Sequence, residues 1–454
     1  MRPSQLESVR AAVKEIRVKR VFAVGSMVAL ALSIGAARAD AQQPAPSSPA
    51  AQQPPPLPTE PSAIDDTMEA GESASEQPTR GMVKFNEFEG PFGSVRFGGG
   101  FLYDYVSYEQ DAGSKEQFDL SPQWKIRDTR FLIHMKFKTK RPTSFSTGIM
   151  YDYNAEKWVM RQTHLMVSVP EIWGDIAVGR TKEGFSMNKV MVGYGGWTME
   201  RQPINDATLP ILADGIKWLG YVPSKRILWN LGFYGDGLSE GQTFSTYENQ
   251  VSGRFAFVPI LSPSGGNLVH IGVSHRYGKT KDGKIKLRAR PGAWAAPYFI
   301  DTGDIAADGT KLTSIEAYWR PHSVTVGGEY FNERVDSSAD GTLLFHGAEA
   351  FVTWLLTGET RTYNTKGGYF NQVAPASPIY SGGRGAIELV MHGTYADLDD
   401  KTITGGRYWR LTPMVNWYLS NEIRLEFAYG YSSLNRFGIV GKTQFFQTRI
   451  QLQL

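Results

Sequence analysis

The chain has 454 residues, with 48 Lys and Arg against 45 Asp and Glu, and no cysteine. A net charge of +3 is too small to indicate a nucleic-acid partner, and the absence of cysteine excludes disulfides and thiolate chemistry. Mean hydropathy is -0.31, and beyond the amino-terminal region no run of about 20 apolar residues could form a transmembrane helix. A membrane barrel also has low mean hydropathy, because its short strands alternate lipid-facing and lumen-facing residues. Composition leaves a soluble β-protein and a barrel both open.

The first 80 residues predict an export signal and a tether. Residues 1–39 have the pattern of a secretory signal peptide, with basic side chains before an apolar run from Val21 to Ile34 and a small-x-small site at Ala37–Ala39. Residues 40–80 are rich in Pro and Gln and then in acids, which predicts a disordered linker. We favour a plain tether over a segment that binds a cell-wall polymer. The mature chain is therefore expected to leave the cytoplasm.

Residues 81–454 are predicted to be all β, because apolar and polar residues alternate with period two and no long segment has helical spacing. From Phe131 to Lys138, for example, one face carries Phe131, Ile133, Met135 and Phe137, and the other carries Leu132, His134, Lys136 and Lys138. Strands of about ten residues would number about sixteen and form a transmembrane antiparallel barrel around a water-filled lumen. Aromatic residues near strand ends fit an interfacial girdle, and an ordinary aromatic core fits them equally well.

A run of alternating cations stands out at residues 284–290, Lys-Ile-Lys-Leu-Arg-Ala-Arg. In an extended strand Lys284, Lys286, Arg288 and Arg290 lie on one face at intervals of about 6.6 Å, and the apolar residues lie on the other. Four adjacent cations repel one another, so this face requires water or a passing anion to screen it. A solvated sheet edge protected by lysines would show the same pattern. We call these four residues the cationic row and treat them as a candidate anion ladder.

Two segments near the end of the chain repeat the alternation. From Ile423 to Tyr431 and from Phe446 to Leu454, apolar and aromatic residues occupy one face. Arg424 and Arg449 lie on the polar face, where they are weaker candidates for contact with a solute in the lumen, as is Lys136. Acidic residues share that face, as expected for a lumen wall of mixed charge.

Three stretches resemble the phosphate-selective porins called O and P. The first runs from Gly179 to Ser186 and on to Met199-Glu200-Arg201, and the second is the cationic row followed by Phe299–Gly303. The third and most specific combines residues 355–363, 385–389 and 416–419 in the order and spacing of the family. The resemblance covers residues 81–454.

The resemblance implies a trimeric outer-membrane barrel of sixteen strands, in which a basic ladder guides anions to a narrow zone formed by an inward-folded loop. The cationic row matches this ladder, and Arg201 falls where the constriction loop is expected. Two rungs are Lys where the family favours Arg. A Lys ammonium is a hydrated point charge rather than a planar fork, so the row suits general anion preference better than bidentate phosphate recognition.

Two other classes of protein remain alternatives: an outer-membrane barrel enzyme that hydrolyses lipid or peptide, and a soluble secreted β-protein that binds an anionic polymer. Seven His are present, but none has the spacing of a metal site, and no Gly-x-Ser-x-Gly elbow occurs. We therefore expect no catalytic residue, no metal and no cofactor. Arg361, two residues after Glu359, is interpreted as a structural partner of that acid.

The sequence thus predicts a passive porin for small anions, with phosphate or pyrophosphate as the solute. Cations at intervals of about 6.6 Å would provide several shallow binding sites in series, weak enough for each ion to leave. The predicted partners are phosphate or other small anions, outer-membrane lipid and two further copies of the chain in a homotrimer, with no nucleic acid.

Overall fold

The computed structural model describes residues 86–153, 156–191, 194–210, 212–235, 247–262 and 266–454. The predicted signal peptide at 1–39 and the linker at 40–80 lie outside these residues and stay predictions. None of the helices in the described part of the chain is long and apolar enough to cross a membrane.

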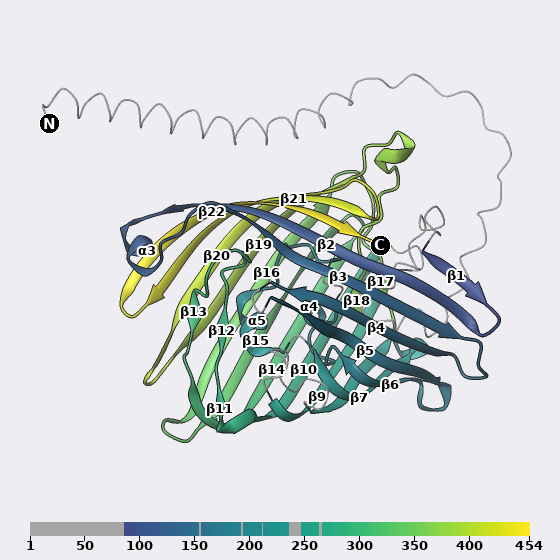
Figure 1. Cartoon of the computed structure of the whole chain (residues 1–454), viewed down its shortest axis with the longest axis horizontal. Coiled ribbons are helices and arrows are strands. Elements are labelled where there is room, and N and C mark those ends of the chain that lie inside the picture. Colours follow the sequence, from purple (N-terminus) through teal and green to yellow (C-terminus); the bar gives the residue numbers. More distant parts are fainter. Residues whose placement is uncertain (1–85, 154–155, 192–193, 211, 236–246, 263–265) are drawn as a thin grey trace, which may run out of the picture. The chain divides into compact units, whose positions relative to one another are not determined.

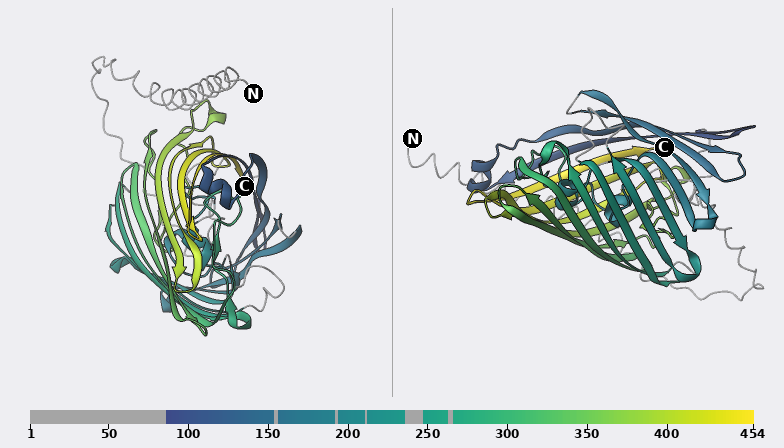
Figure 2. Two further views of the ribbon diagram at one scale, coloured as in Figure 1. Left: turned by 90° about the vertical axis from the view of Figure 1, so that its left-hand side faces the viewer. Right: turned by 90° about the horizontal axis from the view of Figure 1, so that it is seen from below.

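The described residues form a closed antiparallel β-barrel of sixteen strands (Figures 1 and 2). Each strand pairs with the next barrel strand along the chain, and β2 pairs with β22 to close the wall, with Tyr105 opposite Thr448. The prediction of an all-β barrel with about sixteen strands is confirmed. The strands are β2 (Gly93–Gln110), β3 (Gln123–Phe137), β4 (Thr143–Asp152), β5 (Lys157–Val169), β6 (Gly174–Thr181), β7 (Ala213–Val222), β8 (Ile227–Gly235), β9 (Tyr247–Leu261), β10 (Asn267–Thr280), β14 (Ile305–Pro321), β15 (Val324–Ser337), β16 (Gly341–Leu355), β19 (Ala386–Asp400), β20 (Ile403–Tyr418), β21 (Ile423–Arg436) and β22 (Ile439–Gln453).

The alternation of the sequence determines the two faces of this wall. On β21 the Phe427 side chain is 39% exposed on the outer face, whereas Arg424 on the inner face is 2% exposed. Phe131 on β3 is likewise 58% exposed. Successive side chains of a strand point to opposite faces, so one register places every residue of a strand. The result is an apolar outer face, which suits lipid, and a polar inner face.

Several short elements lie next to the ends of the strands. Asp111 caps α3 (Ala112–Gln117), because its Oδ1 accepts a hydrogen bond of 2.8 Å from the backbone N–H of Ser114. This helix packs against β22. Other short elements are β1 (Glu87–Gly90), which pairs with β2, and the turns η3 (Pro170–Ile172) and η4 (Pro223–Lys225).

Long connections join some of the strands, and parts of them lie inside the barrel (Figure 1). The connection between β6 and β7 carries α4 (Met187–Val190) and α5 (Pro203–Thr208), and we call it the α4–α5 segment. The connection between β10 and β14, residues 281–304, is called the row segment. It contains η5 (Lys281–Gly283), β11 (Lys284–Ile285), β12 (Arg288–Ala289) and β13 (Ile300–Asp301). A third connection, between β16 and β19, contains β17 (Tyr363–Asn364), β18 (Tyr369–Phe370) and η6 (Ile379–Ser381).

Apolar side chains attach these segments to the inner wall. Trp197 of the α4–α5 segment is fully buried, and its ring stacks on that of Phe351 from β16 at a centroid distance of 4.0 Å. In the row segment Ile285 and Leu287 belong to a buried cluster that includes Phe299 and Phe345. Burial of this apolar area favours the inward position of both segments. The inward segments, rather than a wide open lumen, therefore define the space available to a solute.

Candidate anion pathway

A cavity of about 870 Å³ lies between the two inward segments and the inner wall at β3, β4 and β5. Twelve basic and six acidic side chains line it. Such an excess of one sign of charge in a walled space raises the local concentration of counter-ions, here anions. The basic residues are the four of the cationic row and Arg127, Arg130, Arg161, Lys182, Lys189, Arg201, Lys281 and Arg449.

All four residues of the cationic row line this cavity. Lys284, Lys286 and Arg288 are exposed and Arg290 is half-buried, while the intervening apolar side chains are buried. The alternation survives although β11 and β12 are only two residues long each, because β11 pairs with β14 and β12 pairs with β13. The row segment is thus held extended by two different partners.

Asp304 compensates the lysine half of the row. Its Oδ1 is 2.9 Å from Lys286 Nζ and its Oδ2 is 3.6 Å from Lys284 Nζ. The hydrogen bond from Lys286, with the charge of both lysines, holds the pKa of the Asp304 carboxyl below its ordinary value. The two lysines and one carboxylate together carry a single net positive charge.

Aromatic rings accompany the arginine half. The Arg288 guanidinium carbon is 4.2 Å from the centre of the Tyr298 ring, and that of Arg290 is 4.6 Å from the same ring. Both rings that contact the row, Tyr298 and Trp294, line the cavity. The row therefore has two chemically different halves. At one end the ammonium groups of Lys284 and Lys286 pair with Asp304, and at the other the guanidinium groups of Arg288 and Arg290 contact aromatic rings.

Arg201 lies in the α4–α5 segment and lines the cavity. Its place in a constriction, which the family resemblance implied, stays a prediction. Its Nε donates to the carbonyl of Asn188 at 3.0 Å and its Nη2 to that of Met191 at 3.5 Å. Arg201 therefore ties two parts of the segment together and contributes positive charge to the wall of the cavity.

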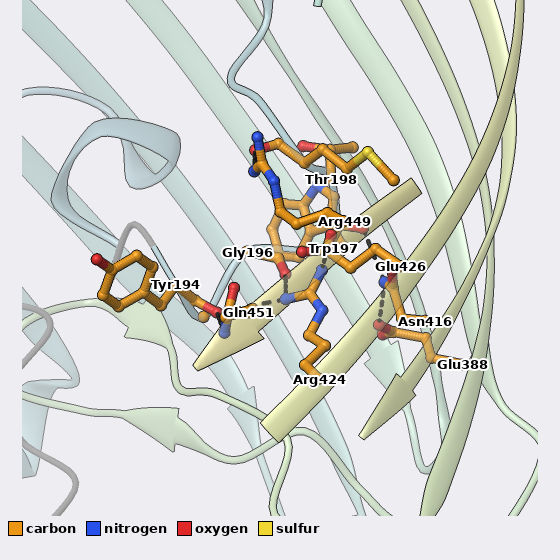
Figure 3. A network of polar contacts seen from close by, with 12 residues as sticks. Tyr194, Gly196, Trp197, Thr198, Glu388, Asn416, Arg424, Glu426, Arg449 and Gln451 are labelled. Atoms are coloured by element: carbon orange, nitrogen blue, oxygen red, sulfur yellow. Dashed lines mark hydrogen bonds and ion pairs between the residues drawn. The ribbon is translucent and has the colours of Figure 1, made fainter. Parts of the chain in front are cut away.

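Arg424 lies on the inner face, as predicted, but its two terminal amino groups are hydrogen-bonded to protein (Figure 3). Its Nη2 is 2.6 Å from Glu426 Oε2, and its Nη1 donates to the carbonyl of Gly196 at 2.7 Å. Because the side chain is 2% exposed and does not line the cavity, we correct its expected role. Arg424 supports the α4–α5 segment rather than contacting a solute.

Arg449 is buried as well, although it lines the cavity. It forms a double ion pair with Asp104 at 2.6 and 2.7 Å, a third contact of 2.5 Å with Glu200, and a hydrogen bond to a backbone carbonyl of the α4–α5 segment. Its charge is thus largely compensated. Lys136 is half-buried on the inner face of β3 and does not line the cavity.

Arg361 has a different partner from the one that the sequence suggested. Its Nη2 lies 2.9 and 3.0 Å from the two carboxylate oxygens of Glu388 on β19, and both side chains are buried. Glu359 instead accepts a hydrogen bond from Thr357. The structural interpretation of Arg361 stands, with the acid corrected from Glu359 to Glu388.

Three glutamates of the inner wall hold the start of α4. The backbone N–H of Met187 donates to Glu316 Oε2 at 2.6 Å, and that of Asn188 donates to Glu329 Oε1 at 2.8 Å. The Asn188 side-chain amide donates to Glu349 Oε1 at 2.8 Å. We call these acids, one on each of β14, β15 and β16, the glutamate latch. These three hydrogen bonds join buried groups of the inward segment to three neighbouring strands and fix the segment to the wall.

Sequence reasoning missed the latch, Asp304 and the rings at Trp294 and Tyr298. The sequence does place these two aromatic residues soon after the cationic row. The alternation of apolar and polar residues, however, does not indicate that the chain turns back and brings these rings against the row. Within the described residues no cluster of His, Cys, Asp or Glu has the arrangement of a metal site.

A sequence model of the family described as phosphate-selective porin O and P matches residues 100–453. Porin O of Pseudomonas aeruginosa is 23% identical over 208 residues, which are 39% of this chain and 47% of that relative. The chain spans less than half the length of the curated relatives that it matches.

Two solved structures illustrate the likeness of the fold. An in-vitro folded OmpT of Vibrio cholerae, an outer-membrane protein in its trimer form, is 13% identical with a TM-score of 0.51, over 80% of this chain and 100% of that one. An anion-selective porin from Comamonas acidovorans is 12% identical with a TM-score of 0.50, over 80% of this chain and 100% of that one. At these identities the similarity concerns the barrel fold alone.

Proposed function

Because the chain belongs to the family of phosphate-selective porins O and P, a family of the bacterial outer membrane, we propose that it is a passive channel that selects small anions. The observation that carries this proposal is the cationic row, whose four residues all line a cavity with six more basic than acidic side chains. Location in the outer membrane removes the soluble secreted alternative.

The proposed mechanism is electrostatic. An anion that enters the cavity is attracted by several exposed cations in turn, and no single site holds it tightly, because water screens each charge. The compensated lysine end attracts anions weakly, and the arginine end attracts them more strongly. Anions therefore move between sites of unequal depth rather than along four equal rungs.

We propose phosphate or pyrophosphate as the solute, and a homotrimer surrounded by outer-membrane lipid as the assembly. The family description supports the first proposal, and the trimer form of a protein with the same fold supports the second. We also propose that the protein is a channel and not an enzyme. The buried His270 and His392, which a hydrolase could use, each pair with a latch glutamate, at 2.7 and 2.9 Å respectively.

The test is current measurement in a planar bilayer that contains the purified protein. The reversal potential in a potassium chloride gradient gives the preference for anions, and addition of phosphate or pyrophosphate shows which of them reduces the chloride current. The double variant Lys286→Gln, Arg288→Gln removes two cations from the cavity wall and should lower anion preference while the channel still inserts.

A matched control removes a cation outside the cavity. Lys311 is exposed, pairs with Asp336 at 3.2 Å and does not line the cavity. Lys311→Gln should leave the reversal potential unchanged. If the double variant has the reversal potential of the wild type, the cationic row does not select the solute. A protein that inserts and forms no channel would return the enzyme to consideration.

A further inference from the structure

Three guanidinium groups and two aromatic rings alternate along the wall of the cavity. The Arg127 guanidinium carbon lies 3.9 Å from the centre of the Trp294 ring, and that of Arg290 lies 4.8 Å from the same ring. Arg290 also contacts the Tyr298 ring at 4.6 Å, and Arg288 contacts that ring at 4.2 Å. The order is Arg127, Trp294, Arg290, Tyr298, Arg288, and we call this arrangement the aromatic column.

The turn after the cationic row explains why the two rings face the cavity. Gly292 has a φ of 74°, a conformation that strains other residues, and it starts the reversal of the chain. Ala293, Ala296 and Phe299 are fully buried on the far side of this turn. The backbone N–H of Phe299 then returns to the carbonyl of Ala289 at 3.0 Å. Small buried residues on one side leave the large rings only the cavity side.

A ring face attracts a cation, so each ring offsets part of the repulsion between the arginines that it contacts. A guanidinium group that stacks flat on a ring makes this contact with its face. Its N–H groups point outward in the guanidinium plane, so they stay available as hydrogen-bond donors. A ring that stacks on a guanidinium group holds it without accepting its hydrogen bonds, whereas a carboxylate partner would occupy those donors.

The donors of the column are not equally available. Arg127 is occupied by Glu200, with contacts of 2.8 and 3.0 Å. Arg290 donates one hydrogen bond, to the carbonyl of Ala296. Among the described residues, the Arg288 side chain contacts the Tyr298 ring and no hydrogen-bond acceptor. Among the described residues, Arg288 and Arg290 are therefore the two guanidinium groups of the column without a carboxylate at ion-pair distance, although Asp301 is the cross-strand neighbour of Arg288.

We propose that Trp294 and Tyr298 are positioning residues of an oxyanion site formed by Arg288 and Arg290, and that they make the channel prefer phosphate-like oxyanions to chloride. This inference rests on the proposed function. An oxyanion presents two oxygens that match two parallel N–H groups, whereas chloride is a sphere that accepts from any direction. Fixed guanidinium planes therefore favour the oxyanion, and the charge alone determines the preference for anions over cations.

The two preferences can be measured in one experiment on the reconstituted full-length protein. The reversal potential in a potassium chloride gradient reports anion preference, and the inorganic phosphate concentration that halves the chloride current reports the oxyanion site. Trp294→Leu and Tyr298→Leu keep every charge, so the reversal potential should stay as in the wild type. The half-blocking phosphate concentration should rise about fivefold in each variant, as expected for loss of one or two cation–π contacts.

Conservative variants separate positioning from a merely structural role. Tyr298→Phe and Trp294→Phe retain a ring face, so phosphate block should return toward the wild-type value. An unchanged reversal potential in the leucine variants also shows that the channel has folded and inserted.

Each contrary outcome has a separate meaning. A wild-type channel without anion preference overturns the proposed function. Anion preference without phosphate block overturns the oxyanion site. Phosphate block that the double variant Trp294→Leu, Tyr298→Leu leaves unchanged overturns the positioning role of the rings and leaves the proposed function intact.

Discussion

Replacement of Asp304 by Asn should increase the preference of the channel for anions. Asp304 contacts Lys286 at 2.9 Å and Lys284 at 3.6 Å, and it is about half exposed to the cavity. The amide retains the shape and the hydrogen-bonding oxygen of the carboxylate but removes its charge. The lysine half of the row then carries two uncompensated charges instead of one, and the excess of basic over acidic lining residues rises by one.

The expected size follows from the spacing of the row. A unit charge about 6.6 Å from a passing anion, with water between them, changes the local anion concentration about threefold in the absence of salt. At an ionic strength of about 0.1 M the Debye length is about 10 Å, which reduces the effect to less than twofold. At about 1 M, where the Debye length is about 3 Å, the effect should nearly vanish.

The assay compares reversal potentials of the wild type and Asp304→Asn in potassium chloride gradients of increasing mean concentration. Asp336→Asn is the matched control, because Asp336 also pairs with an exposed lysine, Lys311 at 3.2 Å, and does not line the cavity. An unchanged anion preference of Asp304→Asn at low salt, or an equal change in the control, would show that the lysine half lies off the path of the ions.

Three further predictions concern the groups around the pathway. Burial lowers the pKa of Lys189 to about 7, so this lysine should gain a proton between pH 8 and pH 6 and raise anion preference over that range. Lys189→Gln should reduce this change in reversal potential, and the remaining change should come from Asp206, whose pKa burial raises to about 6. Glu329→Ala removes an acceptor of the glutamate latch, which should weaken the attachment of the α4–α5 segment by about 1–3 kcal/mol and make single-channel currents noisier. Arg361→Met leaves Glu388 buried without its cation and should lower the free energy of unfolding, measured in detergent with urea, by about 3 kcal/mol. As a control, Arg141→Met removes one partner of the exposed Arg141–Glu171 pair and should barely change this free energy.

The alternation of the sequence was sufficient to predict the faces of the strands. Phe427 outside and Arg424 inside follow from period two, because a strand offers only two directions and one apolar face must meet lipid. The cationic row keeps the same alternation of exposed and buried side chains, although only Lys284 and Arg288 belong to strands and these two short strands have different partners. The face on which a side chain lies depends on the residues next to it in the chain, so the local sequence predicts it.

Partners across the barrel could not be predicted in this way. Arg361 has an acid two residues away, yet it pairs with Glu388 on another strand, because burial favours an acid that the inner wall already holds in place. Asp304, Trp294 and Arg127 approach the row through a chain reversal and through closure of the wall. Period two fixes the face of a residue and says nothing about which distant segment lies opposite it.

Arginines of the inner wall and of the inward segments consequently divide into two classes that composition cannot distinguish. Arg449 has two acids within 2.7 Å and supports an inward segment, whereas Arg288 has an aromatic ring and no acceptor among the described residues. Arginines of the first class hold the inward segments in place. Arginines of the second class supply the positive charge that attracts a solute anion. A count of basic residues on the inner wall therefore overstates the charge that a solute meets. The charge that selects an ion is the part that the barrel has left without a carboxylate.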